Sequence, residues 1–360
     1  MSNRLSVKKF LKTSALALAI FFASGLLALL IFEFIYRSQL IDTFRAELQA
    51  YNSPQVLSAA GRKTLLTMGD SFSAGNTSYP AWLRVFQDDY RVINASVPGT
   101  GALEAAAAAP RRFEEFKPSV FIYQVYVGND LYNISYPVNW STVSFLRNVY
   151  WSVAQRLRSV WFINYKNGQL AYLLQQSDGT IELQNDWDAV NQLPVPLEPE
   201  PEPGFSPERY ALRDRIMIQA DPWIIDDQIN VKGGRSGDYR IFLDKLTELL
   251  ALCQAPRCRA YVLIIPHAAQ VDPSYLRAWQ ALGAQFDQPQ TLDTDTYPFI
   301  NGVQNLLRKQ GMAHVKLLNP IALLRESERQ GKPVYYRNDS HLNLYGQQLI
   351  AQFIIQEIGI

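Results

Sequence analysis

Residues 65–75 read LLTMGDSFSAG, and this stretch decides how the chain folds. An apolar run meets a Gly-Asp-Ser turn, and small residues follow it, which is typical of a buried parallel strand that ends in a tight turn. Ser71 would then lie at the carboxyl edge of a sheet, where open α/β folds bind their ligands. A serine hydroxyl becomes a nucleophile only when a base takes its proton, so the sequence must also supply that base.

The candidate base lies far downstream, in residues 338–343, which read NDSHLN. The chain has three histidines, and His341 is the one with a carboxylate two residues before it and a helical pattern after it. We expect His341 to activate Ser71, and Asp339 to orient and stabilise the imidazole.

Two further turns follow apolar runs between these points, at residues 94–99 (NASVPG) and 127–130 (VGND). Gly99 could offer a bare backbone N–H and Asn129 a side-chain amide, which together with the backbone N–H of Ser71 are donors for an oxyanion. Alternatively, Gly99 only permits a turn and Asn129 only caps one. Their order between Ser71 and His341 favours the oxyanion hole.

The order Ser, Gly, Asn, His, each at a strand end, resembles the SGNH (GDSL-type) hydrolase superfamily. Residues 69–71 (GDS) match its first block, Gly99 its second, Asn129 its third, and Asp339 with His341 its last. The resemblance covers about residues 62–130 and 237–360. It implies a three-layer, flavodoxin-like α/β fold with a central parallel sheet.

Two positions depart from the family pattern. The third block is usually Gly-x-Asn, but Val127 stands two residues before the asparagine and Gly128 is adjacent to it. The last block is often Asp-x-x-His, but position 338 is Asn338. The Asp-x-His form ending in Leu-Asn resembles the branch related to polysaccharide O-acetylation proteins. That resemblance implies a serine esterase or O-acyltransferase, without a cofactor, that acts on acyl esters, expected to be acetyl esters, of cell-envelope or secreted glycans.

Apolar runs alternate with helical patterns on both sides of a central interruption. We expect five strands, at residues 65–68, 91–95, 119–127, 260–265 and 314–318, with helices between them and an amphipathic helix at the carboxyl terminus. This alternation predicts a parallel sheet with helices on both faces.

The amino terminus predicts a membrane anchor. Residues 1–12 are basic, and Thr13 to Phe32 carry no charge, a length that spans a bilayer as a helix. We expect a transmembrane helix over residues 13–35, a stalk over residues 36–62 and the hydrolase domain over residues 63–360. The basic flank would stay in the cytoplasm and the domain would lie in the periplasm. A cleaved signal peptide is the competing interpretation.

The alternation stops over residues 131–236, which we interpret as a large insertion in the domain. Helical spacing over residues 143–161 and a hairpin over residues 170–183, turning at Asp178-Gly179, are expected there, followed by a Pro- and Glu-rich surface loop. The insertion contains five of the seven tryptophans. Either they stack on sugars over a cleft, or they form the insertion's own small core. They are Trp140, Trp151, Trp161, Trp187 and Trp223.

The net charge and the small numbers of cysteine and histidine limit which ligands and cross-links the chain is expected to have. The formal net charge of the 360 residues is +1, which gives no reason to expect nucleic acid, and three histidines with two cysteines make no obvious zinc cluster. Cys253 and Cys258 could form a short-loop disulfide in an oxidising periplasm, or stay as two unlinked thiols.

The expected partners are an ester-bearing small molecule or glycan, the inner membrane through the amino-terminal helix, and polysaccharide export or modification proteins. A different class of function stays open at this point. The domain could be a catalytically silent, membrane-tethered binding or assembly subunit of a polysaccharide export system.

Overall fold

A computed structural model describes residues 2–59, 61–135, 144–177, 187, 189–199, 203–287 and 289–360, with only the backbone for residues 2–11 and 168–177. The chain divides into two compact units. The smaller comprises residues 1–43 and 152–182, and the larger comprises residues 44–151 and 183–360. The expected boundaries at residues 13, 36 and 63 stay predictions.

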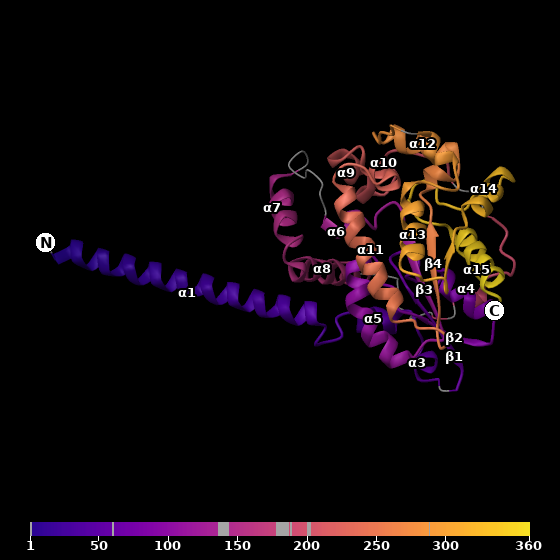
Figure 1. Ribbon diagram of the computed structural model, residues 1–360. Helices are drawn as coiled ribbons and strands as arrows, with labels where there is room; N and C mark the ends of the chain where they lie inside the picture. Colours follow the sequence, from indigo (N-terminus) through magenta and orange to yellow (C-terminus); the bar gives the residue numbers. More distant parts are fainter. Residues whose placement is uncertain are drawn as a thin grey trace. The chain divides into compact units, whose positions relative to one another are not determined.

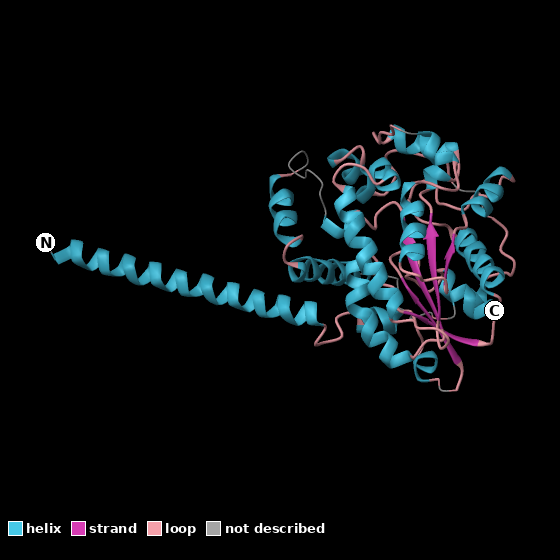
Figure 2. Cartoon of the chain, in the orientation of Figure 1, coloured by secondary structure: helices cyan, strands magenta, loops and turns pink. Residues whose placement is uncertain are grey.

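The larger unit is built on five parallel strands in the order β2-β1-β3-β4-β5, drawn as magenta arrows in Figure 2. This is the flavodoxin-like order, in which a ligand site is expected beside β1 and β3. All five strands predicted from the sequence are present. They are β1 (Lys63–Met68), β2 (Tyr90–Asn94), β3 (Val120–Tyr126), β4 (Arg259–Ile265) and β5 (Val315–Leu318).

Helices cover both faces of this sheet, so the predicted three-layer α/β fold is confirmed (Figure 1). On one face α4 (Tyr79–Phe86) packs against α15 (Leu344–Ile358). On the other, α5 (Ala102–Phe116) packs against α11 (Arg235–Ala251), beside α13 (Pro298–Lys309). The strands alternate their apolar side chains between the two layers, and each layer buries large side chains such as Trp82 and Phe242.

The larger unit also contains shorter helices. Residues 44–59, expected to be stalk, belong to it, because the Asn52 amide pairs with both the backbone N–H and the carbonyl of Asn94, at 2.9 and 2.7 Å. The short helices are α2 (Arg45–Ala50), α3 (Pro54–Ser58), α6 (Tyr132–Ser135), α9 (Leu212–Ala220), α10 (Ile224–Asn230), α12 (Pro273–Ala281) and α14 (Ile321–Arg329), with 3-10 turns at Ala189–Gln192, Ala268–Gln270 and Pro289–Asp293.

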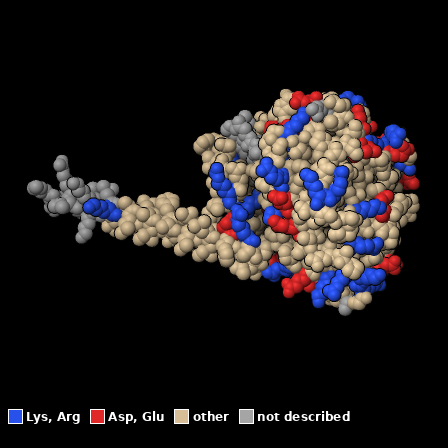
Figure 3. Space-filling model, in the orientation of Figure 1, with Lys and Arg blue, Asp and Glu red and all other residues tan. Residues whose placement is uncertain are grey.

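The smaller unit centres on the long helix α1 (Ser2–Ser38). Its segment Lys12–Ser38 is long and apolar enough to cross a membrane, and Figure 3 shows a largely uncharged surface along it. Near the end of α1, Glu33 accepts hydrogen bonds from the backbone N–H groups of Arg158 and Ser159, at 3.1 and 2.7 Å. These residues begin α8 (Arg158–Ser177), so a carboxylate satisfies backbone donors that the first turn of a helix leaves free.

The helical pattern predicted from residue 143 is confirmed over the described residues as α7 (Phe145–Ala154) and α8. The predicted hairpin over residues 170–183 is wrong where it can be compared, because residues 170–177 are the last part of α8. Residues 178–183 lie outside the described residues. Leu170, Leu173 and Leu174 have the i, i+3, i+4 spacing of a helix. The hairpin prediction gave more weight to the Asp-Gly turn signal than to this helical spacing.

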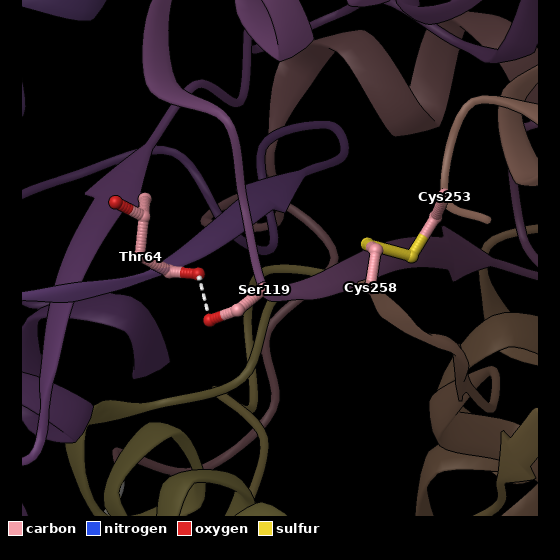
Figure 4. The surroundings of a disulfide bond; sticks show 4 residues. All are labelled: Thr64, Ser119, Cys253 and Cys258. Carbon is pink, nitrogen blue, oxygen red and sulfur yellow. Dashed lines mark hydrogen bonds between the residues drawn. A yellow bond between two sulfur atoms is a disulfide. The ribbon is translucent and has the colours of Figure 1, made fainter. Parts of the chain in front are cut away.

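Cys253 and Cys258 form a disulfide, with their Cα atoms 5.0 Å apart (Figure 4). The bridge joins the segment after α11 to the start of β4. Beside it in Figure 4, the N–H and hydroxyl of Ser119 both donate to the carbonyl of Thr64, at 2.9 and 3.2 Å. This is the amino end of the strands, so the bridge stabilises the edge of the sheet opposite to Ser71.

Candidate active site

Ser71 lies in a tight turn directly after β1. The carboxylate of Asp70 accepts the N–H of Phe72 at 3.0 Å, and the carbonyl of Asp70 accepts the N–H of Ser73 at 3.1 Å. Gly69 is required just before the turn, since a Cβ there would lie 2.4 Å from Oε1 of the buried Gln124. The Gly-Asp-Ser sequence is therefore fixed by a close approach of β3 as well as by the turn itself.

Ser73, two residues on, has a structural environment. Its side chain is fully buried and its hydroxyl donates to Gln124 Oε1 at 2.7 Å. Its carbonyl accepts Asn94 Nδ2, also at 2.7 Å. Ser73 thus ties β1, β2 and β3 together, and Ser71 is the serine of this turn that lines a cavity.

The structure brings Ser71, His341 and Asp339 together, although 270 residues separate the first two. The hydroxyl oxygen of Ser71 lies 2.8 Å from Nε2 of His341. On the other side of the ring, Nδ1 of His341 contacts Oδ1 of Asp339, and the same oxygen accepts the backbone N–H of His341 at 2.8 Å. This is the geometry in which an imidazole can take the serine proton while the carboxylate fixes its orientation.

The loop that carries His341 is held at both ends. The N–H of Tyr336 donates to the carbonyl of His341 at 3.1 Å, and the N–H of Asn343 donates to the carbonyl of Val334 at 3.0 Å. Asn343 then caps α15 by accepting the N–H of Gly346 at 2.8 Å. The imidazole therefore projects from a short loop fixed to the start of a core helix.

Charge favours the protonated form of His341. Burial lowers the pKa of its imidazole, but the hydrogen bond and charge of Asp339 outweigh burial, and the charges of Asp70 and Asp214 add to them. The pKa of His341 is therefore raised above 6.5. Burial also acts on Asp339, raising its pKa, yet its hydrogen bonds with His341 outweigh that effect and the pKa is lowered.

Asn129 lines the same cavity as Ser71 and His341. Burial raises the pKa of Asp70, and hydrogen bonds from the Phe72 N–H and the Asn129 amide oppose that rise. The oxyanion role of Asn129 stays a prediction.

Position 128, next to Asn129, requires a glycine. A Cβ at position 128 would lie 2.5–2.6 Å from three atoms of the Tyr126 side chain, including its hydroxyl oxygen. The ring of Tyr126 stacks in turn on Phe72 at a centroid distance of 3.9 Å. A glycine is therefore needed next to Asn129, because an aromatic side chain lies across the turn.

Gly99 is placed differently from the other predicted site residues. It has a positive φ of 72°, which suits glycine, and it precedes the start of α5. Over the part of the chain that the structure describes, Gly99 does not line the cavity that Ser71, Asn129 and His341 share. Its role as an oxyanion donor stays a prediction.

The cavity has a volume of about 190 Å³ and contains residues that the sequence analysis missed. Asp214, on α9, interacts with Ser340 and with the charges of Asp339 and His341, and burial raises the pKa of its carboxyl group. Most of the missed residues lie in the insertion, where no strand pattern marks an active-site edge. Tyr126 and Ser340 lie beside predicted site residues, and the other missed residues are Ala211, Arg213, Asp214, Met217, Ile218, Ile224, Ile225 and Trp279.

The described tryptophans of the insertion do not line this cavity. Of the five, Trp140 lies outside the described residues, and none of the other four lines the cavity. Trp161 instead stacks on Tyr165 at 5.3 Å in the smaller unit. The cavity tryptophan is Trp279 of α12, which the sequence analysis did not single out.

His267, at the end of β4, lies behind Trp279 and does not line the cavity. The two rings meet edge to face at 4.6 Å, and Nδ1 of His267 accepts the N–H of Ala269 at 3.2 Å. Complete burial lowers the pKa of His267 to about 3. A neutral histidine in this position supports the cavity wall.

Comparisons with known proteins add little to this geometry. No family model matches the chain, and no curated protein matches it. Among solved structures, it is similar to the crystal structure of LAE5, an alpha/beta hydrolase enzyme from the metagenome of Lake Arreo, Spain. That similarity has a TM-score of 0.38 at 14% identity, covering 84% of this chain and 98% of the other, and it is too low to carry an inference.

Proposed function

We propose that this chain is a serine esterase or O-acyltransferase that works through an acyl-serine intermediate. The observation that carries the proposal is the contact series from Ser71 through His341 to Asp339, which lines a cavity large enough for a small ester. The same site supports hydrolysis and acyl transfer, because the two reactions differ only in the acceptor.

The mechanism follows from these positions. His341 Nε2 takes the proton of Ser71 as the serine oxygen attacks the ester carbonyl. The backbone N–H of Ser71 and the Asn129 amide would stabilise the oxyanion, and loss of one such donor typically costs about 2.7–4 kcal/mol. Collapse of the tetrahedral intermediate expels the alcohol, which receives the proton from His341. Water or a sugar hydroxyl then attacks the acyl-serine, with His341 again acting as the base.

We further propose that the substrates are acyl esters of cell-envelope or secreted glycans. The membrane-compatible helix α1 and the disulfide between Cys253 and Cys258 support a site outside the cytoplasm, because such bridges persist in oxidising compartments. The resemblance of residues 338–343 to the polysaccharide O-acetylation branch supports a glycan as the donor or acceptor.

Active-site labelling tests this function. The purified full-length chain is incubated in detergent with a serine-reactive fluorophosphonate, and the modified residue is located by mass spectrometry. We expect labelling at Ser71 and none in Ser71→Ala, with Ser236→Ala as the matched control because Ser236 is exposed and lies outside the cavity.

Labelling that persists in Ser71→Ala would reject Ser71 as the nucleophile. Failure of the wild-type chain to label would favour the silent binding subunit instead. Release of acyl groups from an acylated glycan, measured with and without an acceptor glycan, separates an esterase from a transferase.

A further inference from the structure

The cavity beside Ser71 has two chemically different sides. Near Ser71 and His341 it is polar, with Asn129 and Ser340 among its lining residues. Elsewhere its lining is apolar and comes from three helices. The apolar lining residues are Met217 and Ile218 of α9, Ile224 and Ile225 of α10, and Trp279 of α12, and all five are buried.

This apolar wall is fixed in place relative to the candidate oxyanion turn. The buried Gln228 of α10 accepts the N–H of Tyr132 at 3.1 Å and donates to the carbonyl of Gly128. Its amide also donates to the carbonyl of Ile224 at 3.0 Å. The part of the wall that α10 supplies is therefore held against the turn that carries Asn129.

The chemistry of the wall limits which part of a glycan ester can occupy it. Sugar hydroxyls placed against Ile224, Ile225 and Met217 would lose hydrogen bonds to water without gaining partners, which is unfavourable. A hydrocarbon chain loses no hydrogen bonds there, and each methylene removed from water contributes favourably. An acyl chain is the part of the substrate that fits.

We infer that the acyl group carried by Ser71 extends along this apolar wall and is longer than acetyl. The inference rests on the proposed function and replaces its expectation of an acetyl group. Five apolar side chains from three helices line this side of the cavity, which is more apolar surface than the single methyl of acetate can cover. The alcohol part of the ester then lies on the polar side, toward Arg213, Asp214 and Ser340.

The experiment compares p-nitrophenyl acetate, butyrate and hexanoate as substrates of the full-length chain in detergent. We expect kcat/KM for butyrate to exceed that for acetate by about tenfold or more, since one methylene in a fitted apolar pocket is worth at least that factor. Ile225→Trp should lower the butyrate-to-acetate ratio, and Ile225→Ala should raise the hexanoate-to-butyrate ratio. The opposite directions separate a change of pocket size from a general loss of folding.

Leu212→Trp is the matched control, because Leu212 lies on α9 but is 62% exposed and outside the cavity. It should leave all three ratios unchanged. Acetate as the best substrate, with ratios that do not respond to Ile225 variants, would overturn the acyl-pocket inference while leaving the esterase intact. Absence of Ser71-dependent turnover with every ester would instead overturn the proposed function.

Discussion

Asn338 accepts a hydrogen bond from the backbone N–H of Ser206 at 2.8 Å through its side-chain oxygen. Its amide nitrogen donates to the carbonyl of Gly204 at 3.1 Å, and its own carbonyl accepts the N–H of Ala211 at 3.0 Å. Asn338 thus fastens the His341 loop to the segment that leads into α9. The adjacent Asp339 contacts the imidazole.

Asp339→Asn should therefore lower kcat strongly, and the corresponding change in another triad lowers it by about 10⁴-fold. Asn338→Asp should have a smaller effect, because an aspartate still accepts the Ser206 N–H but no longer donates to Gly204. Steady-state kinetics on a p-nitrophenyl ester check both variants, with circular dichroism and thermal unfolding as the control for folding. Full activity in Asp339→Asn would mean that another group orients His341.

The pH profile should follow His341, which must be neutral to act as a base. Because its pKa is raised above 6.5, the acidic limb of kcat/KM should lie above pH 6.5, and activity should fall as pH falls through it. The negative charge of Asp214 contributes to the raised pKa, so Asp214→Asn should move the limb to lower pH. A limb that does not move would mean that Asp214 carries no charge over this range.

Stability has a different pH dependence from activity. The raised pKa of His341 contributes to the free energy of unfolding. This contribution is complete below pH 6.5 and is lost as pH rises through the pKa that His341 has in the folded protein. The lowered pKa of Asp339 gives a second stabilising contribution, which is present above pH 3.8 and is lost as pH falls through the pKa that Asp339 has in the folded protein. The pair therefore stabilises the fold most between these two limits, on the acidic side of the activity limb, which thermal unfolding across pH would show.

Gly128→Ala should disturb the turn that carries Asn129, because the new methyl group would meet the Tyr126 ring within 2.6 Å. Overpacking of this kind typically costs about 1–3 kcal/mol, and we expect activity to fall with it. Gly237→Ala is the control, since no atom lies within 4 Å of its Cβ position in α11, and it should leave unfolding unchanged or slightly later. Equal stability of the two variants would show that Tyr126 moves aside freely.

Membrane topology is the remaining prediction. Basic residues before α1's uncharged segment should keep the amino terminus in the cytoplasm and place Ser71 outside it. A phosphatase fused to the carboxyl terminus should be active, and protease added to spheroplasts should degrade the larger unit. A cytoplasmic readout would contradict both the glycan substrate and an oxidising environment for the cysteines.

The sequence predicts the framework well because its signals are local. The apolar runs that become β1 to β5, and the motifs at residues 69–71 and 338–343, each lie within a few consecutive residues. Parallel strands end at the same edge of the sheet, so the approach of Ser71 and Asn129 follows from the ends of β1 and β3. His341 does not follow a strand, because it lies in the loop between α14 and α15, and only its motif marks it in the sequence.

The cavity wall could not be predicted in the same way. Met217, Ile218, Ile224 and Ile225 lie on two short helices in the insertion, and their role depends on how α9 and α10 pack over the sheet edge. No periodicity distinguishes a cavity-lining isoleucine from a core isoleucine. The contacts of Asn338 with Ser206 and Gly204 likewise depend on residues more than 120 positions away in the sequence.

The buried amide of Gln228 hydrogen-bonds both to α10 and to the turn at Gly128. It therefore connects α10, which would contact the acyl chain, to the turn with Asn129, which would stabilise the oxyanion. On the proposal that α10 lines an acyl pocket, we expect a substitution that shifts α10 to displace Gly128 and its neighbour as well. Chain-length preference and catalytic rate are then expected to change together.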